Sequence, residues 1–142
     1  MTSNGEPIDG QTGSSLLLTP AHVGAKIAVS VTGERAGTDA KTVTSTATAA
    51  VAPGTLVAST PKISGPTKVG NKLRVTVAAW SPDASYSYTW YANGKVIAKA
   101  NTTSLTLSKS LVGKTIKVRV TGTAEGYAAK SVYSASTAKI RK

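Results

Sequence analysis

Hydrophobic and polar residues alternate with a period of two along much of the chain, which is the spacing of a β-strand with one buried face. The clearest segment is residues 86–91, where Tyr86, Tyr88 and Trp90 alternate with Ser, Thr and Tyr. The pair Asn93-Gly94 follows directly. Asn-Gly supplies the two positive φ angles that a tight type I′ hairpin turn requires. We therefore expect a core strand that ends in a hairpin.

Similar short segments lie on both sides of this strand, and no apolar i, i+3, i+4, i+7 pattern runs long enough to predict a helix. Strands are expected at residues 62–64, 72–77, 86–91, 95–98, 104–107, 114–121 and 130–138. Seven short strands separated by turn residues are typical of an all-β, immunoglobulin-like Greek-key β-sandwich. Its expected core residues are Trp80, Tyr88, Trp90, Ile116, Val118 and Val120.

The chain also matches itself at a separation of 89 residues. Residues 4–53 align with residues 93–142 without a gap and with 20 identities in 50 positions, and the pair Asn4-Gly5 falls on Asn93-Gly94. Such self-similarity predicts a structural repeat. We expect residues 54–142 to be one complete repeat. Residues 1–53 would be the C-terminal part of another repeat, without its first strands and its tryptophan strand.

An incomplete repeat has a core face that its own residues do not cover. In residues 1–53 this face carries Ile27, Val29 and Val31, and a large exposed apolar surface is unfavourable in a soluble monomer. Three arrangements resolve this: the missing half precedes the repeat in a longer protein, another chain supplies strands through a homodimer or strand swap, or residues 1–53 are partly disordered. We expect residues 54–142 to fold alone and residues 1–53 to need a partner.

Several motifs of the complete repeat resemble a known family. They are Thr60-Pro61-Lys62-Ile63-Ser64-Gly65, Lys68-Val69-Gly70, Trp80-Ser81-Pro82, Tyr88-x-Trp90-Tyr91-x-Asn93-Gly94 and Val120-Thr121-Gly122. These motifs are similar to the tandem immunoglobulin-like repeats of actinobacterial secreted and cell-surface proteins, which also occur on related phages. The resemblance covers residues 60–140 fully and residues 4–53 in part. It implies a module appended to hydrolases or surface proteins, and it supplies no catalytic or binding residues.

Composition argues against several classes of function. Without cysteine the chain has no disulfide framework and no thiolate metal site. His22 is the only histidine and aligns with Leu111, which favours a packing or surface role over a role as ligand or base. The six carboxylates form no sequence pattern suited to acid–base catalysis. We therefore expect no enzymatic activity, cofactor or metal.

The net charge of +11 belongs to one part of the chain. Residues 1–53 carry three basic and four acidic residues, whereas residues 54–142 carry fourteen basic and two acidic residues. Two pairs of basic side chains should point outward from strands in opposite sheets, and so form two small patches: Lys72 with Arg74, and Lys117 with Arg119. These patches predict either a solvated surface or contact with anionic cell-wall polymers. Nucleic acid is disfavoured because no platform of exposed aromatic residues accompanies the charge.

Three further aromatic side chains are candidates for stacking on sugars or for simple packing: Tyr91, Tyr127 and Tyr133. The expected function is a non-catalytic extracellular or cell-surface module that spaces, displays or attaches other domains of a parent protein. The alternatives are a carbohydrate- or wall-polymer-binding module, a phage virion decoration or tail appendage, and a strand-exchange assembly module. No apolar run approaches the ~20 residues of a membrane span, and no signal peptide begins the sequence, which predicts a fragment of an exported protein.

Overall fold

The computed structural model describes all residues, 1–142, and divides into two compact units. Unit 1 is Met1–Gly54 and unit 2 is Thr55–Lys142. The prediction of an all-β fold is confirmed, because the named strands pair antiparallel and the only helices are two three-residue 3-10 turns. Neither turn approaches the length and apolar character that a membrane-crossing helix needs.

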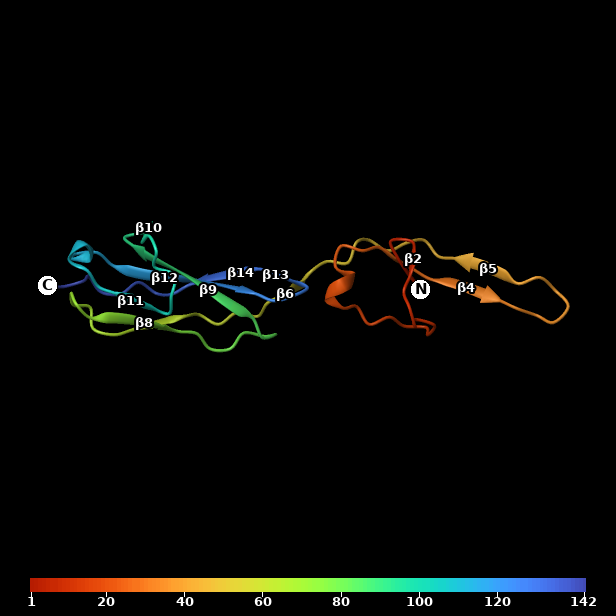
Figure 1. Ribbon diagram of the computed structural model, residues 1–142, viewed down its shortest axis with the longest axis horizontal. Coiled ribbons are helices and arrows are strands. Elements are labelled where there is room, and N and C mark those ends of the chain that lie inside the picture. The colour runs from red at the N-terminus through yellow and green to blue at the C-terminus, as the bar shows by residue number, and fades with distance from the viewer. The chain divides into compact units, whose positions relative to one another are not determined.

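Unit 2 is built mainly from two antiparallel sheets, and Figure 1 shows β8 and β11 along one side of the unit with β12 and β14 along the other. The first sheet has the order β11-β8-β7, formed by Ser104–Thr106, Lys72–Thr76 and Lys62–Ser64. The second has the order β10-β9-β12-β14, formed by Lys95–Val96, Ser85–Ala92, Ile116–Thr123 and Lys130–Tyr133. The remaining elements are β6 (Gly54–Thr55) at the boundary of the units, η2 (Lys109–Leu111) and β13 (Tyr127–Ala128).

The core of unit 2 consists of the residues that the alternation places inward. On β8, Leu73 and Val75 are buried while Lys72 and Arg74 are exposed. On β12, the alternate residues Ile116, Val118 and Val120 are fully buried. Trp90 is also fully buried, Trp80 is nearly so, and the half-buried Tyr88 packs against this cluster. Because no disulfide joins the sheets, this apolar packing is the main interaction between them.

Unit 1 is smaller and has less interior. Its elements are β1 (Thr2–Ser3), β2 (Glu6–Pro7), η1 (Pro20–His22), β3 (Ile27–Ala28), β4 (Ser30–Gly33) and β5 (Lys41–Thr44). They form a sheet of order β2-β1-β3 and the two-stranded sheet β4-β5. Figure 1 shows β4 and β5 side by side. Ala25 is the only buried hydrophobic residue of this unit.

Both Asn-Gly pairs form hairpin turns with positive φ at both positions. The φ angles are 50° and 91° at Asn4 and Gly5, and 47° and 80° at Asn93 and Gly94. Each Asn side chain also accepts a hydrogen bond through Oδ1, at 2.9 Å, from a main-chain N–H of a neighbouring segment. The turns therefore join β1 to β2 and β9 to β10 in the same way.

The strand pairings of unit 1 recur in unit 2 at a displacement of 89 residues. Thr2 pairs with Ala28 as Tyr91 pairs with Lys117, and the four pairs of β4 with β5 correspond to the four pairs of β12 with β14. Side-chain bonds recur as well: the N–H of Val29 donates to Ser45 Oγ at 3.1 Å, and the N–H of Val118 donates to Ser134 Oγ at 3.0 Å. The sequence identities therefore accompany the same local geometry.

Two expectations about the strands need correction, and one segment of unit 1 differs from its counterpart in unit 2. Unit 1 does not lack the tryptophan strand entirely, because β1 corresponds to the last two residues of β9. Residues 15–17 form no strand although their counterpart β11 does, because β11 pairs with β8 and unit 1 has no equivalent of β8. The last strand of unit 2 ends at Tyr133 rather than near residue 138.

Candidate functional site: an aromatic–basic cluster on unit 2

Four side chains gather on the outer face of the β10-β9-β12-β14 sheet: Tyr91, Lys117, Arg119 and Tyr133, which we call the aromatic–basic cluster. The strand registers bring them together, because Lys117 is the pairing partner of Tyr91 and Arg119 is the partner of Tyr133. All four alternate with residues that point into the core, so their side chains leave the opposite face of the sheet.

The contacts within the cluster are aromatic and cation–π contacts. The rings of Tyr91 and Tyr133 have centroids 5.9 Å apart and are tilted by 55°. Lys117 Nζ lies 5.7 Å from the Tyr133 centroid, and Arg119 Cζ lies 5.9 Å from the Tyr91 centroid. These separations fall within the range in which a cation and an aromatic ring attract one another. Each cation therefore sits over a different ring, and the four side chains hold one another in place.

Arg119 is held only in part by protein groups. Its Nη2 lies 3.5 Å from Thr89 Oγ1, at the limit of a hydrogen bond. Its Nε is buried and has no hydrogen-bond partner. A buried donor without an acceptor is unfavourable. Protein groups therefore satisfy the guanidinium group only in part.

The environment of the cluster also affects the Tyr91 hydroxyl. Burial raises the pKa of Tyr91 above its ordinary value, and the neighbouring Tyr133 hydroxyl raises it further. The positive charge of Arg119 opposes this shift by stabilising the phenolate. The hydroxyl is consequently protonated at physiological pH.

The cluster has no counterpart in unit 1. The aligned positions are occupied by small or uncharged residues: Thr2, Ala28, Ser30 and Thr44. Unit 1 nevertheless forms the same strand pairings at these positions. The local fold therefore does not require the cluster, and unit 2 carries it as an added feature.

The other predicted basic pair lies elsewhere on unit 2. Lys72 and Arg74 are exposed on β8, which belongs to the sheet opposite β12. The two basic pairs therefore do not form one surface. Tyr127 also lies outside the cluster, on β13.

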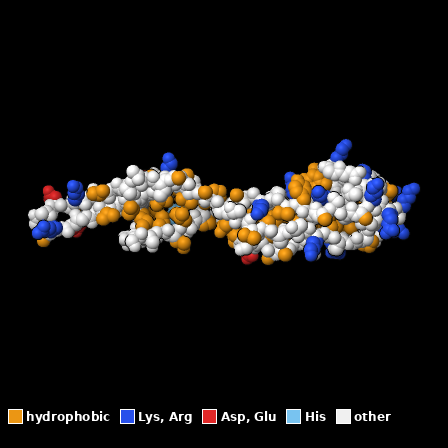
Figure 2. All heavy atoms as spheres, turned by 180° about the vertical axis from the view of Figure 1, so that it is seen from behind, with side chains coloured by type: hydrophobic (Ala, Val, Ile, Leu, Met, Phe, Trp, Pro, Cys, Tyr) orange, Lys and Arg blue, Asp and Glu red, His pale blue; other side chains and the backbone are white.

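Sequence reasoning treated the basic residues and the tyrosines as separate candidates, whereas the structure combines one basic pair with two tyrosines. The sequence feature that could have located the cluster is the alternation on three strands, which directs these four side chains outward. Using it also requires the pairing order β9-β12-β14 and its register. Figure 2 shows that Lys and Arg side chains are numerous over unit 2, so charge alone does not single out the cluster.

His22 lies outside any cluster of ionisable groups. Its Nδ1 accepts a hydrogen bond from the N–H of Thr19 at 2.9 Å and lies 3.0 Å from Thr19 Oγ1. This arrangement forms a capping box at the start of η1. A local structural role accounts for this side chain.

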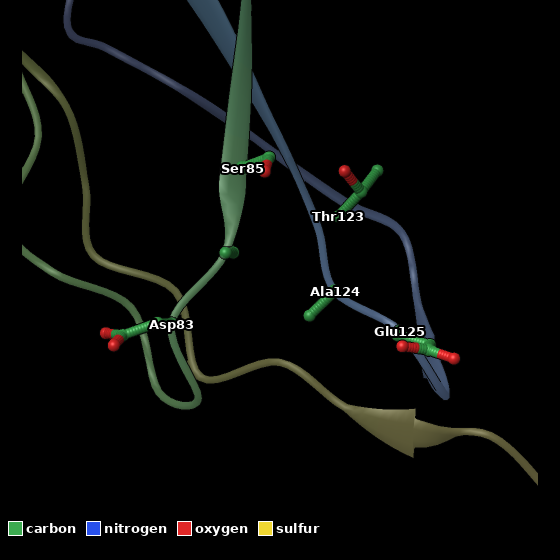
Figure 3. Close-up of a pocket in the computed structure, with 6 residues that line it drawn as sticks. Asp83, Ser85, Thr123, Ala124 and Glu125 are labelled. Atoms are coloured by element: carbon green, nitrogen blue, oxygen red, sulfur yellow. The ribbon is translucent and has the colours of Figure 1, made fainter.

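A hollow on unit 2 is lined by Asp83, Ala84, Ser85, Thr123, Ala124 and Glu125. Figure 3 shows that the Asp83 carboxylate points away from Glu125 rather than toward it. No group of three or more His, Cys, Asp or Glu side chains is placed to hold a metal ion. This hollow therefore presents no arrangement of carboxylates facing a common substrate.

Comparison with protein-family models, curated proteins and solved structures finds no match for this chain.

Proposed function

We propose that the chain is a non-catalytic, extracellular immunoglobulin-like module that spaces, displays or attaches other domains of a larger surface or secreted protein. The observation that carries this proposal is the strand order of unit 2. A three-stranded sheet β7-β8-β11 and a four-stranded sheet β10-β9-β12-β14, with Trp90 on the third strand, support an immunoglobulin-like sandwich.

The recurrence of the same pairings at 89 residues further supports a chain built from tandem repeats of one unit. The short segment Val51-Ala52-Pro53-Gly54 would connect successive repeats, and proline limits the flexibility of such a connection. A series of sandwiches joined by short connections is suited to holding a functional domain away from a surface.

The mechanical behaviour of the intact chain tests the spacer function. A spacer module should unfold under tension in a single cooperative event. Unit 2 should release roughly 300 Å of contour length, from about 3.3–3.6 Å for each of its residues. Single-molecule stretching of the chain between two handles measures this event. Extension without a resolved unfolding event would contradict the proposal.

A second function, binding of an anionic polysaccharide or cell-wall polymer, is favoured by the aromatic–basic cluster. Tyrosine rings offer flat surfaces to sugar rings, while the side chains of Lys117 and Arg119 offer positive charge. The absence of the cluster from the aligned positions of unit 1 indicates a role other than stability.

The two patches of unit 2 provide a matched comparison for this second function. The variant K117Q/R119Q removes two charges from the cluster, and K72Q/R74Q removes two charges from the opposite sheet. Binding of fluorescent polyglycerol phosphate should weaken at least tenfold in the first variant and less than threefold in the second. Equal weakening would indicate non-specific attraction by net charge, and undiminished binding by the first variant would exclude the cluster.

A further inference from the structure

Two tyrosine rings are in contact on the outer face of unit 2, although they come from strands that are not neighbours. Tyr91 lies on β9 and Tyr133 lies on β14, and β12 lies between these strands in the sheet. The ring centroids are 5.9 Å apart at a tilt of 55°, which is within the range for contacting aromatic rings. A covalent bond between the two rings would therefore enclose residues 92–132 in a closed loop.

The hydroxyl ends of the two rings also lie near one another. The Tyr133 hydroxyl is one cause of the raised pKa of Tyr91, and such an effect requires proximity. When a phenol loses a hydrogen atom, the unpaired electron is shared between its oxygen and the ring carbons beside the hydroxyl-bearing carbon. Two such radicals that meet at these carbons couple to form dityrosine. The contact of Tyr91 with Tyr133 brings these parts of the rings together.

Both rings are open to an oxidant and are held in place by their neighbours. Tyr133 is 46% exposed and Tyr91 is half-buried. Lys117 Nζ lies 5.7 Å from the Tyr133 centroid, and Arg119 Cζ lies 5.9 Å from the Tyr91 centroid. These cation–π contacts restrict the motion of each ring. Coupling of the two rings therefore requires little rearrangement of the sheet.

The other tyrosines of unit 2 are placed differently. Tyr86 contacts the ring of Trp80 at a centroid distance of 5.4 Å, and Trp80 is buried. Tyr88 packs against the hydrophobic core. Tyr127 is 38% exposed and lies on β13, which pairs with β6 and not with the four-stranded sheet. Tyr127 is therefore an exposed tyrosine outside the pair and serves as its matched control.

The tyrosine pair is not needed to form the strand pairings around it. The aligned positions of unit 1 carry Thr2 and Thr44, and unit 1 forms the same pairings at these positions. The chain also has no cysteine, so it cannot link its strands through a disulfide. Two tyrosines in contact give such a chain another way to form a covalent bond between strands.

We propose that Tyr91 and Tyr133 are the site of an oxidative dityrosine cross-link that joins β9 to β14 across β12. This inference does not depend on the spacer or binding functions proposed above. The oxidant is hydrogen peroxide used by a haem peroxidase. The cross-link would limit how far unit 2 extends after it unfolds, because the enclosed loop no longer lies in the path of an applied force.

The reaction balances with one molecule of hydrogen peroxide for each cross-link. Each of the two hydroxyls loses one hydrogen atom, and the resulting radicals form one carbon–carbon bond between the rings. The hydrogen atoms on the two bonded carbons then move to the phenolic oxygens, which restores both aromatic rings. The protein loses two hydrogen atoms in total. Hydrogen peroxide accepts them and is reduced to two molecules of water.

Oxidation of the intact chain in dilute solution, with a haem peroxidase and hydrogen peroxide, tests the site. The product should be a monomer that is lighter by two hydrogen atoms and shows dityrosine fluorescence, and peptide mapping should link Tyr91 to Tyr133. Tyr133→Phe removes one phenol and should lower the yield of this monomer at least tenfold. Tyr91→Phe should do the same. The control Tyr127→Phe should change the yield less than twofold.

The same oxidation in denaturing urea separates the native geometry from the intrinsic reactivity of tyrosine. The Tyr91–Tyr133 link should be at least tenfold less abundant there, because the unfolded chain does not hold the two rings in contact. An equal yield in urea or in Tyr133→Phe would overturn the proposal. A product without the cross-link, a link through Tyr127, or links only between separate chains would overturn it as well.

Single-molecule stretching of the oxidised chain provides a second readout of the position of the link. Unlinked unit 2 should release roughly 300 Å of contour length, from about 3.3–3.6 Å for each residue. The linked unit should release about half of this length, because residues 92–132 are bypassed. Release of the full length by the oxidised monomer would contradict a link between β9 and β14 and would overturn the proposal.

Discussion

The indole Nε1 of Trp90 donates a hydrogen bond to the main-chain carbonyl of Thr102 at 2.8 Å. This bond ties β9 near its C-terminal end to the segment that leads into β11, and so links the two larger sheets of unit 2. A fully buried tryptophan is costly to truncate, because its volume and its hydrogen bond are both lost.

The variant Trp90→Phe should therefore destabilise unit 2. Phenylalanine leaves a cavity and leaves the Thr102 carbonyl without its donor, and we expect a loss of about 2–3 kcal/mol in the free energy of unfolding. Urea denaturation followed by circular dichroism measures this loss. The exposed Val96, changed to Ala, is the control and should alter stability by less than about 0.5 kcal/mol. A Trp90→Phe variant as stable as the parent would show that the indole and its hydrogen bond do not stabilise unit 2.

Two aligned glycines should respond differently to the same substitution. Gly122→Ala brings a Cβ to within 3.0 Å of the Trp80 ring and should cost about 1–3 kcal/mol as an overpacked core. Gly33→Ala meets no neighbouring atom in the isolated chain and should be neutral or stabilising by up to about 1 kcal/mol. Thermal unfolding of both variants tests this pair. Equal destabilisation would mean that Gly33 is already covered in the free chain.

Two aligned valines provide a similar comparison of burial. Val120→Thr places a hydroxyl in the core and should destabilise unit 2 by about 1–3 kcal/mol. Val31→Thr places the same hydroxyl on an exposed face and should change stability by less than about 0.5 kcal/mol. Hydrogen exchange of each unit, measured within the intact chain, separates the two effects. A large loss in Val31→Thr would contradict the exposure of this face.

The Tyr91 hydroxyl should titrate above the ordinary pKa of tyrosine. Because burial and Tyr133 both raise this pKa, Tyr133→Phe should lower it, and Arg119→Gln should raise it further. Ultraviolet absorbance of the phenolate follows the titration, with Tyr127→Phe as the control outside the cluster. An unchanged titration in Tyr133→Phe would show that the two hydroxyls do not interact.

The raised pKa of Tyr91 also predicts how the stability of the folded state depends on pH. The contribution of the Tyr91 hydroxyl to the free energy of unfolding is fully present below the ordinary tyrosine pKa of about 10. It is lost as the pH rises from there through the higher pKa of the folded state, because the unfolded chain releases its proton first. Stability measured on either side of this window should fall less in Tyr133→Phe than in the parent chain.

Sequence reasoning identified features that depend on local chemistry. The period of two placed Leu73 and Val75 on one face of a strand, and Asn-Gly fixed both hairpin turns, because strand pleating and positive φ angles are local properties. The 89-residue alignment placed corresponding residues in corresponding pairings, because it preserves register as well as identity.

Features that depend on distant partners were not predictable in the same way. Residues 15–17 carry the pattern of β11 and form no strand, since a strand exists only where another strand pairs with it. The contact of Tyr91 with Tyr133 requires β12 to lie between β9 and β14 in one register. Neither the order of the strands nor their register can be deduced from the residues of a single strand.

The most direct test of the account is residue-resolved hydrogen exchange of the intact chain without a partner. The account predicts strong protection of the amides of Arg119–Gly122, which lie between two strands, and fast exchange at those amides of Ser30–Gly33 that face the open edge of β4. Equal protection of the two segments in the chain alone would contradict the claim that unit 1 is an uncovered counterpart of unit 2.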